Sequence, residues 1–558
     1  MFSLRGRTLL TLLLMTILTL LALIYHMLST SPPISSTTHP NLHNRYPEFA
    51  SLTNVPIHQK SHDSYMSLGS HQSSSSFKGH KIVHLDLKGA PPVLNYYRRL
   101  LKLFKTLGAT GILLEYEDMF PYSDSLQNVS ATNAYSPQDI TKIQEIAFEY
   151  NLMVIPLIQT FGHLEFLLKL DSHKDLREVP RYPQVICPTN PQTLPLLYQM
   201  IDQIIHHHPN LKYLHIGADE VYHIGECSRC FEELSKRQWT KRQLFLSHIK
   251  KIVEYIKGSY PRIKVLMWDD EFRGISPSEI METGLHKMVE PVVWKYTRNP
   301  AAALNQVWEG YSEIWKNVWV ATAFKGATEP DRYWTDISHH LENHQRWLEI
   351  IDHYSDRITF KGVILTGWQR YDHFSILCEL LASALPSLAV NLAVLQAKNA
   401  NEFFGEIPRN VAQALQCEGT VSLTIPEPNY GWTKCRFPGV EVYSVILRLF
   451  GLHQDIQRME EENTFKGWLK EYNIKHVFSN PSYVEQAVVE LDRFKMELVY
   501  IEKEMKSAME GIYDEHTFNE WIETFVVPLN DKVTRLWEAK EKILEKASWP
   551  RRPLKSEL

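Results

Sequence analysis

Short apolar runs alternate with longer segments in which apolar residues recur every three or four positions. The runs that suit buried strands are residues 82–87, 111–114, 153–158, 213–216, 264–267, 289–293, 318–321 and 362–365. Nearly continuous apolar runs are typical of parallel strands that are covered on both faces. Eight such strands separated by helices match a closed (β/α)8 barrel. The pattern therefore predicts an α/β protein with a TIM barrel over residues 80–387.

Polar or aromatic residues follow nearly every predicted strand. They are Asp86 and Lys88, Glu115 and Glu117, Gln159 and His163, Asp219 and Glu220, Trp268 and Asp269, Trp294 and Tyr296, Phe324 and Lys325, and Trp368 and Tyr371. The carboxyl ends of all strands in a parallel barrel meet at one face, where barrel enzymes carry their active sites. The sequence thus predicts a pocket at that face.

The first 79 residues have a different pattern from the predicted barrel. Residues 9–28 are almost entirely apolar and uncharged, and Arg5 and Arg7 precede them. About 20 such residues can span a bilayer, and preceding basic residues favour a cytosolic N-terminus. We expect residues 1–28 to form a cytosolic tip and a signal anchor, with a cleaved signal peptide as the alternative. Residues 29–79 are rich in Ser, Thr and Pro, which predicts a disordered stem.

This topology would make the protein a single-pass type II membrane protein with its barrel in the lumen. The short, threonine-containing apolar run suits the thinner membranes of the Golgi or endoplasmic reticulum. Asn128-Val129-Ser130 is a sequon that the glycosylation machinery could then reach.

The region from 388 to 558 has charged, amphipathic patterns at residues 484–510 and 518–544. They predict a C-terminal helical region that packs against the barrel or against a second subunit in a homodimer.

Composition narrows the functional classes. A formal net charge of −5 over 558 residues gives no reason to expect a nucleic-acid partner. The six cysteines are too few for a disulfide-built fold. Cys227-Ser228-Arg229-Cys230 has the spacing of half a zinc knuckle or a redox pair, but no second pair of ligands follows at a suitable distance. The sequence therefore favours a local disulfide or two free thiols there, and we predict neither a metal nor a cofactor.

The run from Leu214 to Val221 contains the strongest candidate chemistry. A short apolar strand ends at Gly217 and is followed by the adjacent acids Asp219 and Glu220. Neighbouring side chains on a strand point to opposite faces, so both acids can serve one site only where the chain bends, and a glycine allows that bend. The alternative is a surface acid pair that caps the next helix.

Five segments together resemble one family of enzymes. Residues 215–220, with the sequence His-Ile-Gly-Ala-Asp-Glu, resemble the H-x-G-x-D-E motif of family 20 glycoside hydrolases, the exo-β-N-acetylhexosaminidases. The other four are residues 84–92, 115–122, 159–163 and 365–373. They are similar to the hexosaminidase D branch and occur in the same order. The resemblance extends over roughly residues 80–390.

The resemblance implies a retaining exo-glycosidase that removes terminal β-linked N-acetylgalactosamine or N-acetylglucosamine from a glycan. In this family the substrate's own acetamide oxygen is the nucleophile and forms an oxazolinium ion, so no protein nucleophile is needed. Glu220 would be the acid and base. Asp219 would hold the acetamide N–H and stabilise the positive charge.

The remaining pocket residues also follow from the resemblance. Trp268, Trp294 and Trp368 would wall the acetamide group and the sugar ring, Tyr296 would orient the acetamide oxygen, and His163 would support the acids. The other residues expected to bind substrate are Asp86, Lys88, Glu117 and Tyr371.

Two positions depart from the family pattern. Lys88 stands where many members have an arginine, and Gln369-Arg370 stand where many have an acid. Both positions belong to the part that reads the 4-hydroxyl, so the preference between galacto and gluco sugars stays open. Two other functions stay open as well: a glycan-binding pseudoenzyme, and a hydrolase of plain sugars with Glu117 and Glu220 as paired carboxylates.

Overall fold

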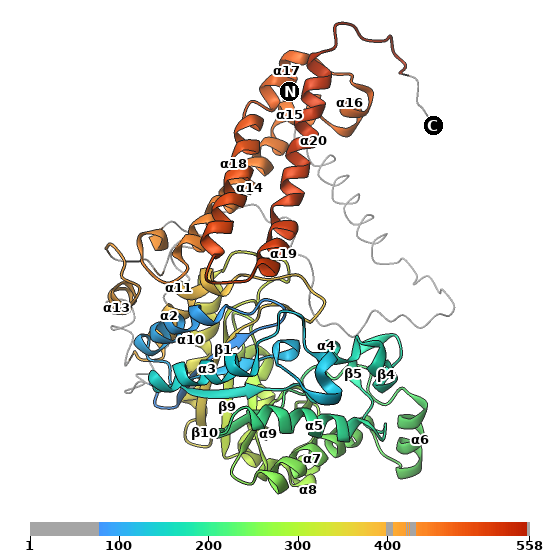
Figure 1. Ribbon diagram of the computed structural model, residues 1–558, viewed down its shortest axis with the longest axis vertical. Helices are drawn as coiled ribbons and strands as arrows, with labels where there is room; N and C mark the ends of the chain where they lie inside the picture. The colour runs from blue at the N-terminus through green and yellow to red at the C-terminus, as the bar shows by residue number, and fades with distance from the viewer. Residues whose placement is uncertain (1–76, 398–405, 420, 422, 424–430, 555–558) are drawn as a thin grey trace, which may run out of the picture. The chain divides into compact units, whose positions relative to one another are not determined.

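The computed structural model describes residues 77–397, 406–419, 421, 423 and 431–554 (Figure 1). Its centre is a closed barrel of eight parallel strands in the order β1-β10-β9-β8-β7-β6-β3-β2. The strands are β1 (His80–Asp86), β2 (Gly111–Glu115), β3 (Met153–Leu157), β6 (Tyr213–His215), β7 (Lys264–Trp268), β8 (Val289–Trp294), β9 (Asn317–Lys325) and β10 (Thr359–Gly367). The predicted barrel is therefore confirmed.

The strands are buried on both faces, which explains their continuous apolar runs. One cluster of buried side chains includes Ile82, Leu113, Ile155, Leu157, Tyr213, Leu266, Trp268, Val292, Trp319, Ala321 and Ile364, which come from the eight strands. A second, larger cluster joins alternate strand residues to the helices. The period of two along each strand therefore separates one set of core residues from the other.

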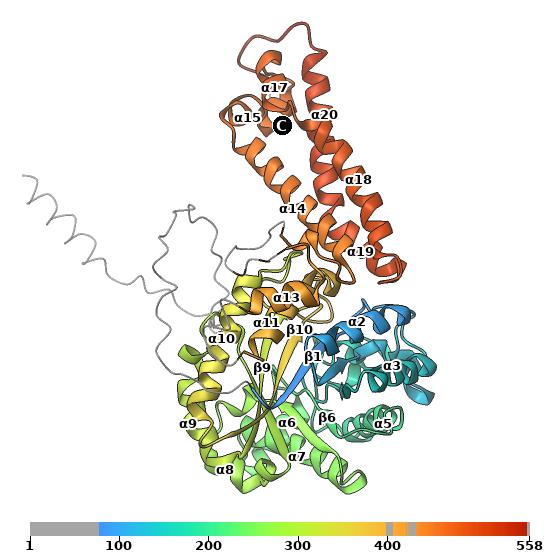
Figure 2. The same ribbon diagram turned by 90° about the vertical axis from the view of Figure 1, so that its left-hand side faces the viewer.

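Helices connect the strands, as the alternation predicts (Figure 2). They are α2 (Leu94–Thr106), α3 (Pro137–Glu149), α4 (Glu165–Leu168), α5 (Thr193–His206), α6 (Ser228–Arg237), α7 (Lys241–Ser259), α8 (Pro277–Thr283), α9 (Ala301–Ile314), α10 (Ile337–Tyr354) and α11 (Leu385–Val394). Capping boxes fix the starts of three of them, at Ser136, Thr240 and Ser276. In each box a hydroxyl accepts from the N3 backbone N–H, and the N3 side chain accepts from the cap residue.

The apolar pattern did not reveal a small antiparallel hairpin between β3 and α5. It consists of β4 (Arg177–Val179) and β5 (Tyr182–Ile186). A three-residue strand is too short to show the alternation that identifies a strand in a sequence. This hairpin lies next to the loop that follows Glu220, because Glu178 accepts hydrogen bonds from the backbone N–H groups of Glu226 and Cys227.

Helices make up most of the C-terminal region. They are α13 (Ile407–Ala414), α14 (Val440–Glu461), α15 (Asn463–Trp468), α16 (Glu471–His476), α17 (Pro481–Ala487), α18 (Leu491–Met509), α19 (Glu515–Phe525) and α20 (Val527–Leu544). The two predicted amphipathic ranges correspond to four helices, because each range is interrupted. Figure 2 shows α14, α18 and α20 as the long helices. Lys532 on α20 pairs with Glu460 on α14 at 3.1 Å.

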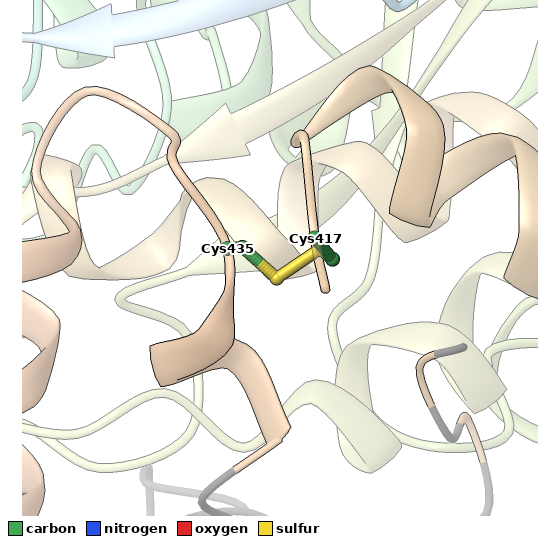
Figure 3. Close-up of a disulfide and its surroundings, with 2 residues drawn as sticks. All are labelled: Cys417 and Cys435. Carbon is green, nitrogen blue, oxygen red and sulfur yellow. A yellow bond between two sulfur atoms is a disulfide. The ribbon is translucent and has the colours of Figure 1, made fainter. Parts of the chain in front are cut away.

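Several polar contacts join these helices to the barrel. The Tyr96 hydroxyl donates to the Pro438 carbonyl at 2.6 Å, and Asn133 donates to Asp514 at 2.9 Å. A disulfide links Cys417, after α13, to Cys435, before α14 (Figure 3).

Among the described residues, no helix combines the length and the apolar character that crossing a membrane requires. The predicted anchor at residues 9–28 lies outside the described residues, as does nearly all of the predicted stem.

Candidate active site

The chain bends sharply after β6, as the sequence predicts. Gly217, Ala218 and Glu220 have φ values of +62°, +65° and +47°. This region of backbone conformation is unfavourable for residues with a Cβ, so the surrounding contacts must hold it. A Cβ on Gly217 would lie 1.9 Å from Gln159 Oε1 and would displace that side chain, and the positive φ adds strain for any residue other than glycine. The bend lets Asp219 and Glu220 reach the same histidine.

His163 and Gln159, both from the loop after β3, hold the two acids. His163 Nε2 lies 3.2 Å from Glu220 Oε2 and 3.7 Å from Asp219 Oδ2. The Gln159 amide donates to Asp219 Oδ1 at 3.2 Å, and its oxygen accepts from the Ala218 N–H at 3.1 Å. The structure therefore brings Asp219, Glu220 and His163 into one cluster.

The charges in this cluster are coupled. Burial raises the pKa of Asp219 to about 7. Burial alone would also raise the pKa of Glu220, but the hydrogen bond and charge of His163 hold it below its ordinary value. For His163, burial opposes the charged form, yet Asp219 and Glu220 together raise its pKa well above 6.5. A protonated His163 beside an ionised Glu220 is thus favoured when the site is free.

Two acids that follow Asp269 at the end of β7, Asp270 and Glu271, were not among the predicted site residues. Asp270 Oδ2 accepts from the Glu220 N–H at 2.9 Å, and its Oδ1 accepts from the Trp294 indole at 3.1 Å. Glu271 accepts from the Val221 N–H at 2.9 Å. These acids fix the strained backbone around Glu220. Their only signal was their place directly after Trp268-Asp269 at a strand end.

Four of the aromatic side chains predicted for the pocket, those of Trp268, Trp294, Tyr296 and Trp368, form one continuous wall. Trp294 stacks on Tyr296 with ring centroids 5.3 Å apart. Trp368 contacts Tyr296 at 6.4 Å and Trp268 at 5.8 Å. The hydroxyl of Tyr296 is buried and forms no well-aligned hydrogen bond within the described chain, although Thr366 and Trp368 lie near it. Burial also raises its pKa.

Lys88 is buried among three carboxylates. Its Nζ lies 3.1 Å from Asp86, 3.2 Å from Glu115 and 3.7 Å from Glu117, and 5.1 Å from the centre of a ring of Trp368. Burial opposes its charge, but these carboxylates outweigh burial and raise its pKa well above 10.5. Lys88 therefore joins the aromatic wall to the predicted sugar-binding acids.

A second residue, His373, also holds the Glu117 carboxylate in place. Its Oε2 lies 2.8 Å from His373 Nδ1, whereas its Oε1 is buried without a hydrogen bond in the described chain. Its φ of +46° indicates a backbone that its neighbours hold in place. His373, which belongs to the motif at residues 365–373, was not named as a site residue.

The departure at Gln369-Arg370 has an unexpected geometry. Arg370 donates twice to Glu520 on α19, at 2.5 Å each, and also to the carbonyls of Lys88 and Ser375. The Gln369 backbone N–H donates to Asp86 at 2.7 Å, while its side-chain amide nitrogen is buried without a partner among the described residues. Arg370 is thus engaged by its protein partners. Of the two residues that could replace the family's acid, Gln369 is therefore the better candidate.

Tyr371 does not join the aromatic wall within the described part of the chain. Burial, followed by the nearby Cys378 and Glu379, raises the pKa of its hydroxyl.

Two other strand-end residues, Phe324 and Lys325, are fully buried. The Lys325 ammonium donates to the Gly367 carbonyl and to that of Trp368, so it supports the backbone of the eighth barrel strand.

Comparison with known proteins agrees with this geometry. Residues 117–371 match the model of the glycosyl hydrolase family 20 catalytic domain. The chain is 44% identical to hexosaminidase D of Bos taurus over 319 residues, 56% of this chain and 91% of that protein. It is 35% identical to hexosaminidase D of Homo sapiens over 456 residues, 80% of this chain and 91% of that protein.

A solved β-N-acetylhexosaminidase structure from Bacteroides fragilis is 16% identical and covers 63% of this chain and 75% of its own. Its TM-score of 0.45 is too low to support a comparison of the two folds.

A parallel barrel with paired acids and an aromatic wall at its strand ends fits a glycoside hydrolase. The chain belongs to glycosyl hydrolase family 20 and, within it, is of the hexosaminidase D type.

Proposed function

We propose that this protein removes terminal non-reducing β-N-acetylhexosamine by substrate-assisted catalysis. The observation that carries the proposal is the approach of Asp219 and Glu220 to one atom, His163 Nε2, at 3.7 and 3.2 Å. Two acids on one side of a small site cannot place a nucleophile and a proton donor on opposite faces of a sugar ring. They can serve a substrate that supplies its own nucleophile.

The proposed reaction has two steps. The acetamide oxygen attacks the anomeric carbon, the bond from that carbon to the leaving oxygen breaks, and Glu220 transfers its proton to that oxygen. Water then attacks the oxazolinium ion, and Glu220 takes a proton from the water, which restores the acetamide and the acid. Asp219 accepts the acetamide N–H and stabilises the positive charge throughout. Intramolecular attack gains the high effective molarity of an oriented neighbour.

Before the reaction, the proton that His163 carries in the free site must pass to Glu220. The free site favours a protonated His163, an ionised Glu220 and a pKa of about 7 for Asp219. An acetamide N–H donated to Asp219 would favour the ionised form of that acid. The proton between His163 and Glu220 belongs to the pair, so Glu220 can receive it from His163 over their 3.2 Å contact.

Buried atoms without partners support the same binding mode. Tyr296 Oη and Gln369 Nε2 are buried and form no well-aligned hydrogen bond in the described residues. Such a group costs about 1–3 kcal/mol until it finds a partner. An acetamide oxygen could satisfy Tyr296, and a sugar hydroxyl could satisfy Gln369.

The alternative with Glu117 as a protein nucleophile has less support. Glu117 already contacts Lys88 and His373, and its carboxylate is held between them. A nucleophile for a sugar needs an oxygen free to form a bond with the anomeric carbon.

A panel of nitrophenyl glycosides tests the proposal and both alternatives. The full chain in detergent should hydrolyse β-N-acetylgalactosaminide and β-N-acetylglucosaminide, with almost no activity on the matching β-galactoside and β-glucoside. A thiazoline that mimics the oxazolinium ion should bind far more tightly than substrate. Equal hydrolysis of plain glycosides would favour the two-carboxylate reaction. Binding without any turnover would favour the pseudoenzyme.

We also propose a luminal location, with residues 9–28 as a type II anchor. The support is the apolar run after Arg5 and Arg7 and the Cys417–Cys435 disulfide, a bond typical of oxidising compartments. Protease treatment of sealed microsomes should leave the barrel intact until detergent is added, and digestion without detergent would contradict the proposal. A homodimer stays a prediction, which sedimentation analysis of the purified chain can test.

A further inference from the structure

Four potential metal ligands converge beside the loop that follows Glu220. They are Glu178 on β4, Cys187 directly after β5, Cys227 at the cap of α6 and Cys230 within α6. One ligand atom from each lies within 4.8 Å of all the others. Glu178, Cys187 and Cys230 are buried, and Cys227 is partly exposed. The sequence revealed only the Cys227–Cys230 half of this group.

The distances suit a tetrahedral metal better than a disulfide. Cys187 Sγ lies 3.4 Å from Cys227 Sγ and 3.6 Å from Cys230 Sγ. Zinc with Zn–S bonds of about 2.3 Å would separate two sulfurs by about 3.8 Å. A disulfide joins its sulfurs at about 2.05 Å. Cys187, Cys227 and Cys230 are all unpaired in the structure, and three thiols cannot all be satisfied by disulfides among themselves.

Surrounding hydrogen bonds orient the four groups. Glu178 Oε1 accepts from the N–H groups of Glu226 and Cys227 at 2.6 and 3.0 Å, which leaves Oε2 at 3.1 Å from Cys230 Sγ. The Cys230 N–H donates to Cys227 Sγ at 3.3 Å. The Thr189 hydroxyl lies 3.1 Å from Cys230 Sγ. Such outer contacts fix ligands and offset the charge of thiolates.

We propose that Glu178, Cys187, Cys227 and Cys230 bind a structural Zn²⁺ ion. Thiolates select zinc over magnesium and calcium, and a carboxylate oxygen is an accepted fourth ligand. Four protein ligands close the coordination sphere, which is the mark of a structural site. The ion would tie the β4–β5 hairpin to the start of α6.

A zinc ion at this position would also affect the loop that follows Glu220. Only six residues separate Glu220 from Cys227, and Val221 is already held by Glu271. The ring of Tyr182, on β5, also stacks on His223 at 4.8 Å, so the hairpin and the loop touch at a second point. The zinc site would therefore limit the movement of the loop between Glu220 and α6.

Metal analysis of the purified full chain tests the proposal. Elemental analysis after growth with zinc and purification without chelators should find about one zinc per chain, as one closed site requires. Cys187→Ser and Cys230→Ser should each lose most of it. Cys378→Ser is the matched control, because Cys378 is also a buried free cysteine but lies outside the group, and it should keep its zinc.

A second measurement applies even if the serine variants fail to fold. Cobalt substituted into the wild-type chain should give the near-ultraviolet absorption of a thiolate–cobalt site, and a strong chelator should abolish it and lower the thermal midpoint. Zinc retained by both Cys187→Ser and Cys230→Ser would overturn the assignment. So would a metal-free wild-type chain in which peptide mapping finds a disulfide between Cys187 and Cys227 or Cys230.

Discussion

The candidate pocket has two sides that are built in different ways. We name the sides after the substrate groups that they would bind in the proposed reaction: the acetamide side consists of Asp219, Glu220, Trp268, Trp294 and Tyr296, and the hydroxyl side consists of Asp86, Lys88, Glu117, Gln369 and Arg370. Residues of the acetamide side come from three neighbouring barrel strands, β6, β7 and β8. The hydroxyl side also comes from three neighbouring strands, β10, β1 and β2, but it reaches in addition to α19 through the pair between Arg370 and Glu520.

In the proposed reaction the acetamide side carries out the chemical step, and the hydroxyl side recognises the sugar. The proposed reaction fixes what the acetamide side must contain, because the nucleophile, the proton donor and the developing charge have set positions on the substrate. The hydroxyl side only has to read the outline of the sugar, and contacts between distant segments set its shape. Changes on the acetamide side should therefore lower kcat, whereas changes on the hydroxyl side should alter KM and sugar preference.

The largest expected effect is at Glu220. Glu220→Gln keeps the shape of the side chain but removes the proton donor, so kcat should fall by about 10²–10⁴-fold with KM nearly unchanged. Glycosides with good leaving groups need little protonation and should lose less. Steady-state kinetics on a leaving-group series measures this. Glu226→Gln, on the same loop, is the control, and an equal loss for all leaving groups would contradict the role of Glu220.

Asp219→Asn should lower kcat for good and poor leaving groups alike, by about 10²-fold or more, because its charge stabilises the oxazolinium ion in both cases. The same leaving-group series measures the effect. Recovery of rate with good leaving groups would instead indicate that Asp219 acts as a proton donor.

His163 should set the alkaline limit of activity. Its pKa is raised well above 6.5, and its proton is available to Glu220 below that raised pKa and is lost as the pH rises through it. His163→Gln removes this reserve, so Glu220 must keep its own proton. The alkaline limb of kcat/KM should then move to lower pH by about one unit or more. An unchanged pH profile would contradict the shared proton, and His206→Gln, an exposed histidine, is the control.

Lys88 should affect stability and binding more than the chemical step. Lys88→Met leaves Asp86, Glu115 and Glu117 buried without their shared cation. Loss of one partner from such a buried group costs about 3–5 kcal/mol of unfolding free energy. Denaturant unfolding should show this loss, and KM should rise more than kcat falls. Lys102→Met, at an exposed position on α2, should change neither, and a Lys88→Met chain with normal stability would contradict the buried network.

The grouping of the acetamide-side residues could be predicted from sequence because their signals are local. The bend at Gly217 and the aromatic residues at strand ends lie within a few residues of predicted strands, so the barrel brings them together. The hydroxyl side depends on contacts far apart in the chain: the Gln369 N–H meets Asp86 over 283 residues, and His373 meets Glu117 over 256 residues. The partner of Arg370 lies 150 residues away on α19 and leaves no local pattern.

The smallest expected effect tests whether α19 shapes the hydroxyl side. Glu520→Gln removes the charge that holds Arg370, although Lys88 and Ser375 carbonyls still accept from it. Because Glu520 is partly exposed, the effect should stay modest: kcat should be unchanged, and the ratio of kcat/KM for the galacto and gluco substrates should shift by about two- to five-fold. Competition between the two nitrophenyl substrates measures that ratio directly. Glu523→Gln, an exposed acid on the same helix, controls for charge alone. A ratio that stays constant in Glu520→Gln would confine recognition to the barrel, whereas a large loss of kcat would show that the two sides of the pocket do not act separately.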